Sequence, residues 1–340
     1  MQIYIDESGT FVPPRRPYRI SAVGALVVPD RDADALFHAF EELAAPWRQG
    51  GQEVKGSALS ETQIAGVIEL VGRYEALFDV RGIDMGLHDA ERIATFQDRQ
   101  ARAVTAQITA EHGPDWQRWG AETEARMRGL SPQLFVQCMV TIYLVLDLLQ
   151  AATIYYAQRM PEELGSFRWF VDPKASTRTE LERLWTDVIM PMAQTQSTVE
   201  PFGTMERCDY SHFARYYVAP EALPTELAEQ MRDKPHDGGI QLKEIMADLT
   251  FPNSATTTGL QIVDILLSSF CRGLNETLGE RGWSMLGRLM TTTKDDRSRL
   301  VFLRTHPEEA LPAGQRTYSR TLAAIEALRR DILTPDRRRS

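Results

Sequence analysis

Short apolar runs that end in turn residues recur along this chain. Residues 1–5 form a β-prone run that stops at Asp6-Glu7-Ser8-Gly9, and residues 18–28 form a second run rich in valine, isoleucine and alanine. Prolines punctuate the segment between them, so the two runs predict an antiparallel hairpin with a long tip. Further strands are predicted at residues 76–85, 167–171 and 241–251.

Between these runs, apolar residues recur at helical spacing. Ser60 is a predicted N-cap, and residues 88–160 are predicted to be mainly helical. The other predicted helices cover residues 32–45, 61–75, 178–192, 259–274 and 317–330. Strands that alternate with helices predict an α/β fold, with a mixed five-stranded sheet flanked by helices and interrupted by helical insertions.

The segment 134–157 is long and apolar enough to consider as a membrane span. Gln137, Asp147 and Gln150 interrupt it, which favours a buried amphipathic helix over a span. We therefore expect no membrane association. The same helix leaves open a homo-oligomeric interface.

Composition narrows the function classes. The 340 residues are 43% hydrophobic and 25% charged, with a net charge of −9, so no global positive field attracts nucleic acid. The three cysteines are widely spaced and form no disulfide framework or zinc motif, and the N-terminus carries no signal peptide. We expect a cytoplasmic protein. The chain also has no phosphate loop of the P-loop type and no nucleophile elbow.

Three aspartates stand where a site is expected in such a fold. Asp6 ends the first predicted strand, Asp172 ends the fourth, and Asp264 lies one turn into an otherwise apolar helix. Strand ends at the carboxyl edge of a sheet commonly form sites. Converging carboxylates repel one another and favour a hard divalent cation, Mg²⁺ or Mn²⁺. The alternatives are a turn residue for Asp6, a turn or cap for Asp172, and a buried paired acid for Asp264.

Four short motifs together resemble one bacterial family. They are Tyr4-Ile5-Asp6-Glu7-Ser8-Gly9, Glu53-Val54-Lys55-Gly56-Ser57, Phe170-Val171-Asp172 and Gly259-Leu260-Gln261-Ile262-Val263-Asp264. The combination resembles the domain-of-unknown-function 3800 family. That resemblance implies a ribonuclease-H-like fold with Asp6, Asp172 and Asp264 as an acidic triad. The turn Pro252-Asn253-Ser254 departs from the pattern, because it lacks an acid before the serine.

Further charged and polar residues lie close in sequence to the three acids. Glu53 is a candidate fourth ligand or catalytic acid; the alternative is a solvated pair with Lys55. Four residues are candidates to bind substrate phosphate. They are Lys55, Lys174, Arg178 and Ser8.

These motifs predict a discontinuous core with insertions. The core covers residues 1–86 and 165–275, with a helical insertion at 87–164, an irregular insertion at 196–240 and a C-terminal helical extension at 276–340.

The leading functional hypothesis is a metal-dependent nuclease that hydrolyses phosphodiester bonds of RNA or DNA, with the resemblance suggesting a place in phage defence or a mobile element. The alternatives are a non-catalytic nucleic-acid- or protein-binding module with the same fold, and a phosphohydrolase of a small nucleotide.

Overall fold

The computed structural model describes residues 1–14, 20–48, 53–105, 108, 113–173, 180–219, 239–291, 298–306, 308–310 and 318–334. In this part of the chain, six strands form a mixed sheet in the order β7-β4-β1-β2-β3-β8. The strands are β1 (Gln2–Ser8), β2 (Ile20–Val28), β3 (Leu77–Asp84), β4 (Arg168–Val171), β7 (Asp248–Thr250) and β8 (Leu300–Val301). Strand β2 is antiparallel to β1 and β3, whereas β4 is parallel to β1, β7 to β4 and β8 to β3.

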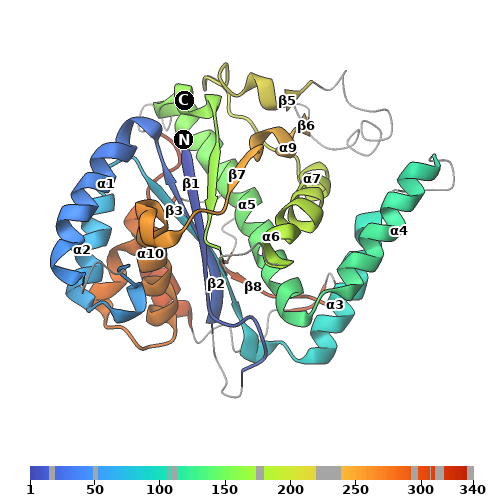
Figure 1. Ribbon diagram of the computed structural model, residues 1–340, viewed down its shortest axis with the longest axis horizontal. Coiled ribbons are helices and arrows are strands. Elements are labelled where there is room, and N and C mark those ends of the chain that lie inside the picture. The colour runs from blue at the N-terminus through green and yellow to red at the C-terminus, as the bar shows by residue number, and fades with distance from the viewer. Residues whose placement is uncertain are drawn as a thin grey trace.

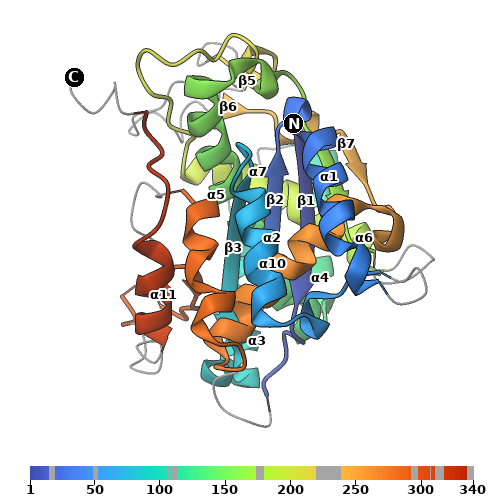
Figure 2. The same cartoon turned by 90° about the vertical axis from the view of Figure 1, so that its left-hand side faces the viewer.

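Helices cover both faces of the sheet (Figures 1 and 2). One face packs against α1 (Asp30–Ala44), α2 (Glu61–Val71) and α10 (Thr258–Leu274). The other face packs against α5 (Pro132–Arg159), beyond which lie α3 (Ala90–Thr105) and α4 (Pro114–Gly129). The predicted α/β class with a mixed, helix-flanked sheet is therefore confirmed.

Side-chain alternation assigns each strand residue to one of the two helical layers. In β1, Ile3 and Ile5 belong to the apolar core on the α5 side, and Tyr4 belongs to the core on the α10 side. Every residue of β2 is buried, because helices cover this central strand on both faces. The same alternation directs Asp6 toward α10 and Glu7 toward α5.

Helix α5 is the one helix in the described part of the chain that is long and apolar enough to cross a membrane. Its most apolar stretch has a mean hydropathy of 1.8, and 72% of that stretch is buried inside the protein. The helix packs on β2 and β3. This packing agrees with the prediction of a buried helix at residues 134–157.

Three sequence predictions need correction. The sheet has six strands rather than five, because the two-residue strand β8 pairs with the edge of β3. The strand predicted at 241–251 is only Asp248–Thr250, since α9 (Leu242–Ile245) takes the first part of that run. The helix predicted at 178–192 is divided into α6 (Glu180–Leu184), a π-helical turn (Trp185–Ile189) and α7 (Met190–Val199).

The smaller described elements lie outside the main sheet. Strands β5 (Tyr217–Val218) and β6 (Gly239–Ile240) form an antiparallel pair of their own. Helix α11 (Ser319–Glu326) is shorter than the predicted helix at 317–330. It packs beside α10 and the 3₁₀ turn Ser284–Leu289.

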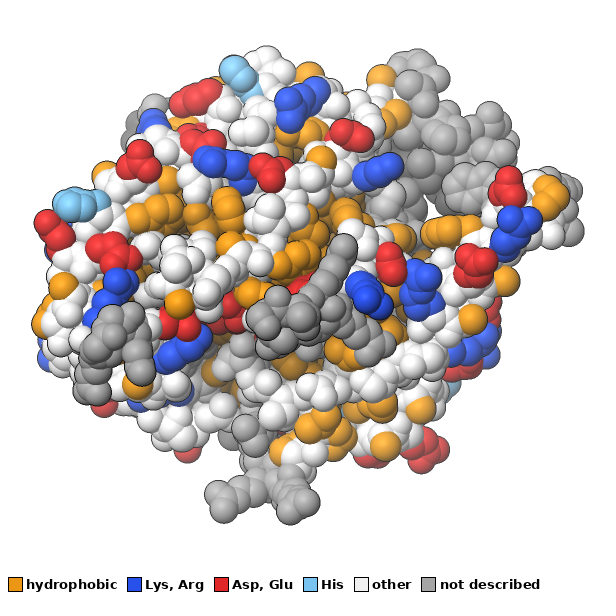
Figure 3. All heavy atoms as spheres, in the orientation of Figure 1, with side chains coloured by type: hydrophobic (Ala, Val, Ile, Leu, Met, Phe, Trp, Pro, Cys, Tyr) orange, Lys and Arg blue, Asp and Glu red, His pale blue; other side chains and the backbone are white. Residues whose placement is uncertain are grey.

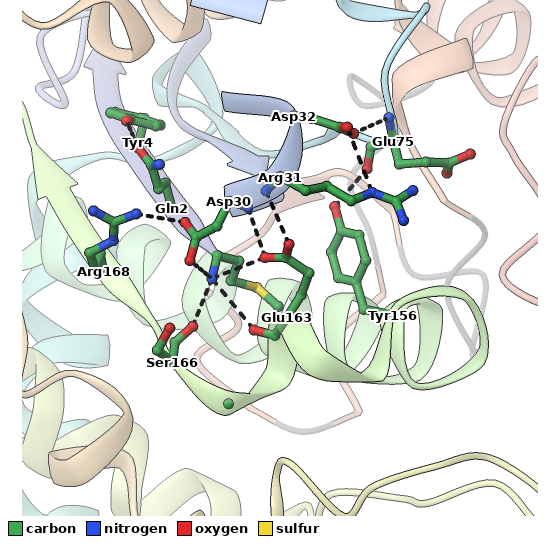
Figure 4. A network of polar contacts seen from close by, with 12 residues as sticks. Gln2, Tyr4, Asp30, Arg31, Asp32, Glu75, Tyr156, Glu163, Ser166 and Arg168 are labelled. Atoms are coloured by element: carbon green, nitrogen blue, oxygen red, sulfur yellow. Dashed lines mark hydrogen bonds and ion pairs between the residues drawn. The ribbon is translucent and has the colours of Figure 1, made fainter. Parts of the chain in front are cut away.

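A polar network fixes the start of β1 against α1 and β4 (Figure 4). The Met1 ammonium lies 3.1 Å from Asp30 Oδ2 and 3.3 Å from Glu163 Oε2. Glu163 also accepts from the first backbone N–H groups of α1, Asp30 N at 2.8 Å and Arg31 N at 3.3 Å. Arg168, the first residue of β4, pairs with Asp30 at 2.7 Å. These contacts hold the β1–β4 register at one edge of the sheet, and that register sets which residues meet at the opposite edge.

Candidate functional site

Asp6 and Asp172 are neighbours at the carboxyl edge of the sheet. Ile5 of β1 pairs with Val171 of β4, and the Asp172 N–H donates to the Ile5 carbonyl at 3.0 Å. One step further along both parallel strands are Asp6 and Asp172, on the face toward α10. Gly9 turns the chain just beyond with a φ of +98°, which glycine adopts without steric cost.

Asp264 reaches the same edge from α10. Its Oδ2 accepts a hydrogen bond from the Gly56 backbone N–H at 2.7 Å, and its carboxyl group is within hydrogen-bonding reach of Asp6. Gly56 must be this close to α10: an added Cβ there would lie 2.7 Å from the Ile265 Cα. The glycine therefore lets the loop before α2 approach the helix and hold Asp264.

That loop also carries Glu53 and Lys55 to the three acids. The Lys55 Nζ lies 2.7 Å from Glu53 Oε1, which forms the ion pair considered from the sequence. Partial burial would lower the pKa of Lys55. The hydrogen bond to Glu53 and the charges of Asp264 and Asp172 outweigh this effect and raise the pKa. Lys55 is thus a partner of Glu53 and an ammonium group in the electrostatic field of the acids Asp6, Asp172, Asp264 and Glu53, which we call the acidic cluster.

The acids of this cluster disfavour their own ionised forms. Burial is the largest cause that raises the pKa of Asp264, and the nearby charge of Glu53 adds to it. Burial likewise raises the pKa of Asp172, with smaller contributions from Glu53 and Asp264. The Ser254 hydroxyl and the Lys55 charge act in the opposite direction on Asp172. A second positive charge would relieve the repulsion that remains.

The chemistry of the acids fits a hard divalent cation, because carboxylate oxygens are its preferred ligands. One such oxygen, Asp172 Oδ1, is buried and accepts no hydrogen bond within the described residues. Across the described ranges, however, no three His, Cys, Asp or Glu side chains are already placed to hold one ion. A bound cation would therefore have to draw the acids together.

The remaining predicted site residues have different surroundings. The side chain of Ser8 lies within hydrogen-bonding reach of Cys271 on α10, and burial raises the pKa of that thiol to about 12. Lys174 and Arg178 lie outside the described residues.

Two contributors to this edge were not assigned from the sequence. The Ser254 hydroxyl, in the 3₁₀ turn Ser254–Thr256, lies within hydrogen-bonding reach of Asp172, and the Gly56 backbone N–H donates to Asp264. Ser254 belongs to the turn Pro252-Asn253-Ser254, which departs from the family pattern, and Gly56 belongs to the motif Glu53-Val54-Lys55-Gly56-Ser57. The motifs therefore marked both positions, but a backbone N–H has no signal of its own in a sequence.

Comparison with known proteins adds no relative. No protein-family model, no curated protein and no solved structure matches this chain. The geometry and chemistry of the acidic cluster and of Lys55 beside it are therefore the features that bear on function.

Proposed function

We propose that this protein is a metal-dependent phosphodiester hydrolase that acts on nucleic acid, with a ribonuclease-H-like fold. The observation that carries the proposal is the meeting of Asp6, Asp172 and Asp264 at one edge of the sheet. Asp6 and Asp172 are neighbours on parallel strands, and Asp264 is within hydrogen-bonding reach of Asp6. Three buried or half-buried acids at one edge of the sheet carry a cost in stability, which a functional site explains.

The topology supports the finer fold proposal. The order of the predicted elements indicates a mixed sheet that begins with an antiparallel hairpin and continues with parallel strands. Strands β1 and β2 form that hairpin, and β4 and β7 continue the sheet in parallel on the other side of β1. In this arrangement Asp6 of β1 and Asp172 after β4 are neighbours, and this supports the proposed site.

Each residue of the cluster then has a defined role. Asp6, Asp172 and Asp264 would hold Mg²⁺ or Mn²⁺, which supplies an activated water and stabilises the leaving oxygen of a phosphodiester. The Gly56 N–H and the Ser254 hydroxyl orient Asp264 and Asp172. The Lys55 ammonium is charged at neutral pH and is available to attract a phosphate oxygen.

A non-catalytic nucleic-acid-binding module with this fold is the second candidate. It is favoured by one observation: the described residues hold no three-residue group already arranged around one ion position. Such a module would bind nucleic acid without hydrolysing it.

The test is a cleavage assay with labelled single- and double-stranded RNA and DNA, in Mg²⁺, Mn²⁺ or EDTA. We expect wild-type cleavage only with metal. We expect the cleavage rate of Asp172→Asn to fall by more than about 100-fold. Loss of a residue that only supports a metal ligand already lowers activity by up to about 100-fold. The control is Asp98→Asn, which changes a partly exposed acid on α3 that pairs with Arg102 and Arg128 and should cleave like wild type.

Two results would contradict the proposal. Wild-type cleavage rates in Asp172→Asn would place the chemistry elsewhere. Binding of nucleic acid by the wild type, with no cleavage in either metal, would instead favour the non-catalytic module.

A further inference from the structure

A cleft of about 1110 Å³ opens beside the acidic cluster. Pro173, which follows Asp172, and Ser254, whose hydroxyl is within hydrogen-bonding reach of Asp172, lie on its border. The cleft therefore begins where the acidic cluster ends. Its other walls come from the π-helical turn and the start of α7, from α9, and from β7 with the residues that follow it. Figure 3 views the molecule in the orientation of Figure 1 and shows hydrophobic side chains gathered near the centre of the visible face, with acidic and basic side chains around them.

The walls of the cleft are largely apolar. Met190 and Leu249 line it from opposite elements, and Phe251 follows β7. All three side chains are only partly buried, and each packs against the apolar core on the α5 side. The ring of Phe251 is thus held by the core while it also lines the cleft. An aromatic ring held in this way offers a stacking surface at little cost in conformational entropy.

The charges around the cleft argue against a phosphate inside it. Glu182 and Glu244 line it together with a single cation, Lys243, among the described residues. Two carboxylates and one ammonium group give these three side chains a formal net charge of −1. An uncharged, flat group fits such a wall better than an anion does. The phosphate itself belongs at the acidic cluster, next to Lys55 and any bound cation.

We propose that this cleft binds the base of an unpaired nucleotide next to the scissile phosphate, so that the protein acts on single-stranded nucleic acid. This inference rests on the proposed function, because it takes the acidic cluster as the position of that phosphate. A base in a duplex has both faces stacked on its neighbours and cannot lie against Phe251. An unpaired base is free to leave the strand and enter the cleft.

The experiment measures binding of a fluorescein-labelled single-stranded 12-mer and of its duplex, about one turn of helix, by anisotropy in the Asp172→Asn background. Three variants separate stacking from packing: Phe251→Ala, Phe251→Leu and Phe251→Tyr. We expect the alanine and leucine variants to bind the single strand about 5- to 150-fold more weakly, the range of one lost base stack. Phe251→Tyr should bind like the parent because it keeps the ring. The control is Trp119→Leu on α4, which removes a partly exposed aromatic away from the cleft.

The outcomes separate the two proposals. Equal binding of single strand and duplex, or unchanged binding in both Phe251→Leu and Phe251→Ala, would overturn the base cleft even if the wild type cleaves nucleic acid. Conversely, ring-dependent binding of the single strand by a wild type that never cleaves would retain the base cleft and contradict the hydrolase. Phe251→Leu preserves apolar volume, so its melting temperature should match the parent and a folding defect in Phe251→Ala cannot decide the result.

Discussion

Replacing Gly56 by alanine tests how the loop before α2 is held against α10. The backbone of Gly56 lies so close to the helix that a Cβ would be 2.7 Å from the Ile265 Cα, 2.7 Å from the Ser268 Cβ and 3.0 Å from the Asp264 carbonyl oxygen. Two of these three neighbours are backbone atoms, which cannot rotate away. The loop must therefore shift, and the 2.7 Å hydrogen bond from Gly56 N–H to Asp264 is lost or stretched.

The magnitude follows from two effects. Overpacking at a closely packed site costs about 1–3 kcal/mol, and a hydrogen bond to a charged group contributes about 1.5–3 kcal/mol. The two together predict a loss of roughly 2.5–6 kcal/mol in the free energy of unfolding. For a chain of 340 residues, this is a fall of about 4–8 °C in Tm.

Urea and thermal denaturation of Gly56→Ala measure this loss directly. The matched control is Gly66→Ala in α2, where an added Cβ meets nothing within 4 Å. That variant should gain up to about 1 kcal/mol from helix propensity. If Gly56→Ala were within about 0.5 kcal/mol of wild type, the normal range for surface substitutions, the close approach of loop and helix would not be what positions Asp264.

Three further predictions concern buried ionisable groups. Burial raises the pKa of Asp264 above its usual 3.8. The folded state therefore loses stability as the pH rises from 3.8 through the raised pKa. Asp264→Asn should raise the metal-free Tm at pH 7 but not near pH 4, and a lower Tm at pH 7 would indicate a structural acid. Burial lowers the pKa of His88 to about 4. About 3 kcal/mol of stability should therefore be present above pH 6.5 and lost as the pH falls toward 4. Urea titrations at several pH values should show a smaller loss of stability with falling pH in His88→Gln, and an equal loss in wild type and variant would contradict this assignment. The buried guanidinium of Arg299 pairs with Asp79. Arg299→Met should therefore lower the free energy of unfolding by about 3–5 kcal/mol. Additive losses in a double-mutant cycle with Asp79→Asn would exclude coupling of the pair.

The acidic cluster shows which features of a site the local sequence pattern predicts and which it does not. Asp6 could be placed in the last part of the first strand because it follows a short apolar run and precedes the Gly9 turn, although β1 extends two residues further, to Ser8. The apolar surroundings of Asp264 predicted a buried, constrained acid. Neither pattern contains the distance between the two residues, because that distance depends on how α10 packs across β1. The hydrogen bond from Gly56 to Asp264 joins residues 208 positions apart, and no local periodicity records such a contact.

The predictions that were wrong concern short or context-dependent elements. Strand β8 has two residues and exists because the edge of β3 offers it hydrogen-bond partners. The run at 241–251 contains both α9 and β7, since a short apolar run carries no length signal to separate helix from strand. Only Asp248–Thr250 lies beside β4 and completes the sheet there.

The sequence by itself determined the α/β class, the hairpin of β1 and β2, and the burial of α5; it also predicted that the first strand ends at Asp6, whereas β1 continues to Ser8. These features depend on periodicity and turn residues within a few positions of one another. The tertiary structure decided the parallel register that makes Asp6 and Asp172 neighbours, the approach of Gly56 to α10, and the cleft lined by Phe251. Each of these depends on packing between segments far apart in the chain, where the free energy comes from excluded volume and buried contacts that no single segment contains.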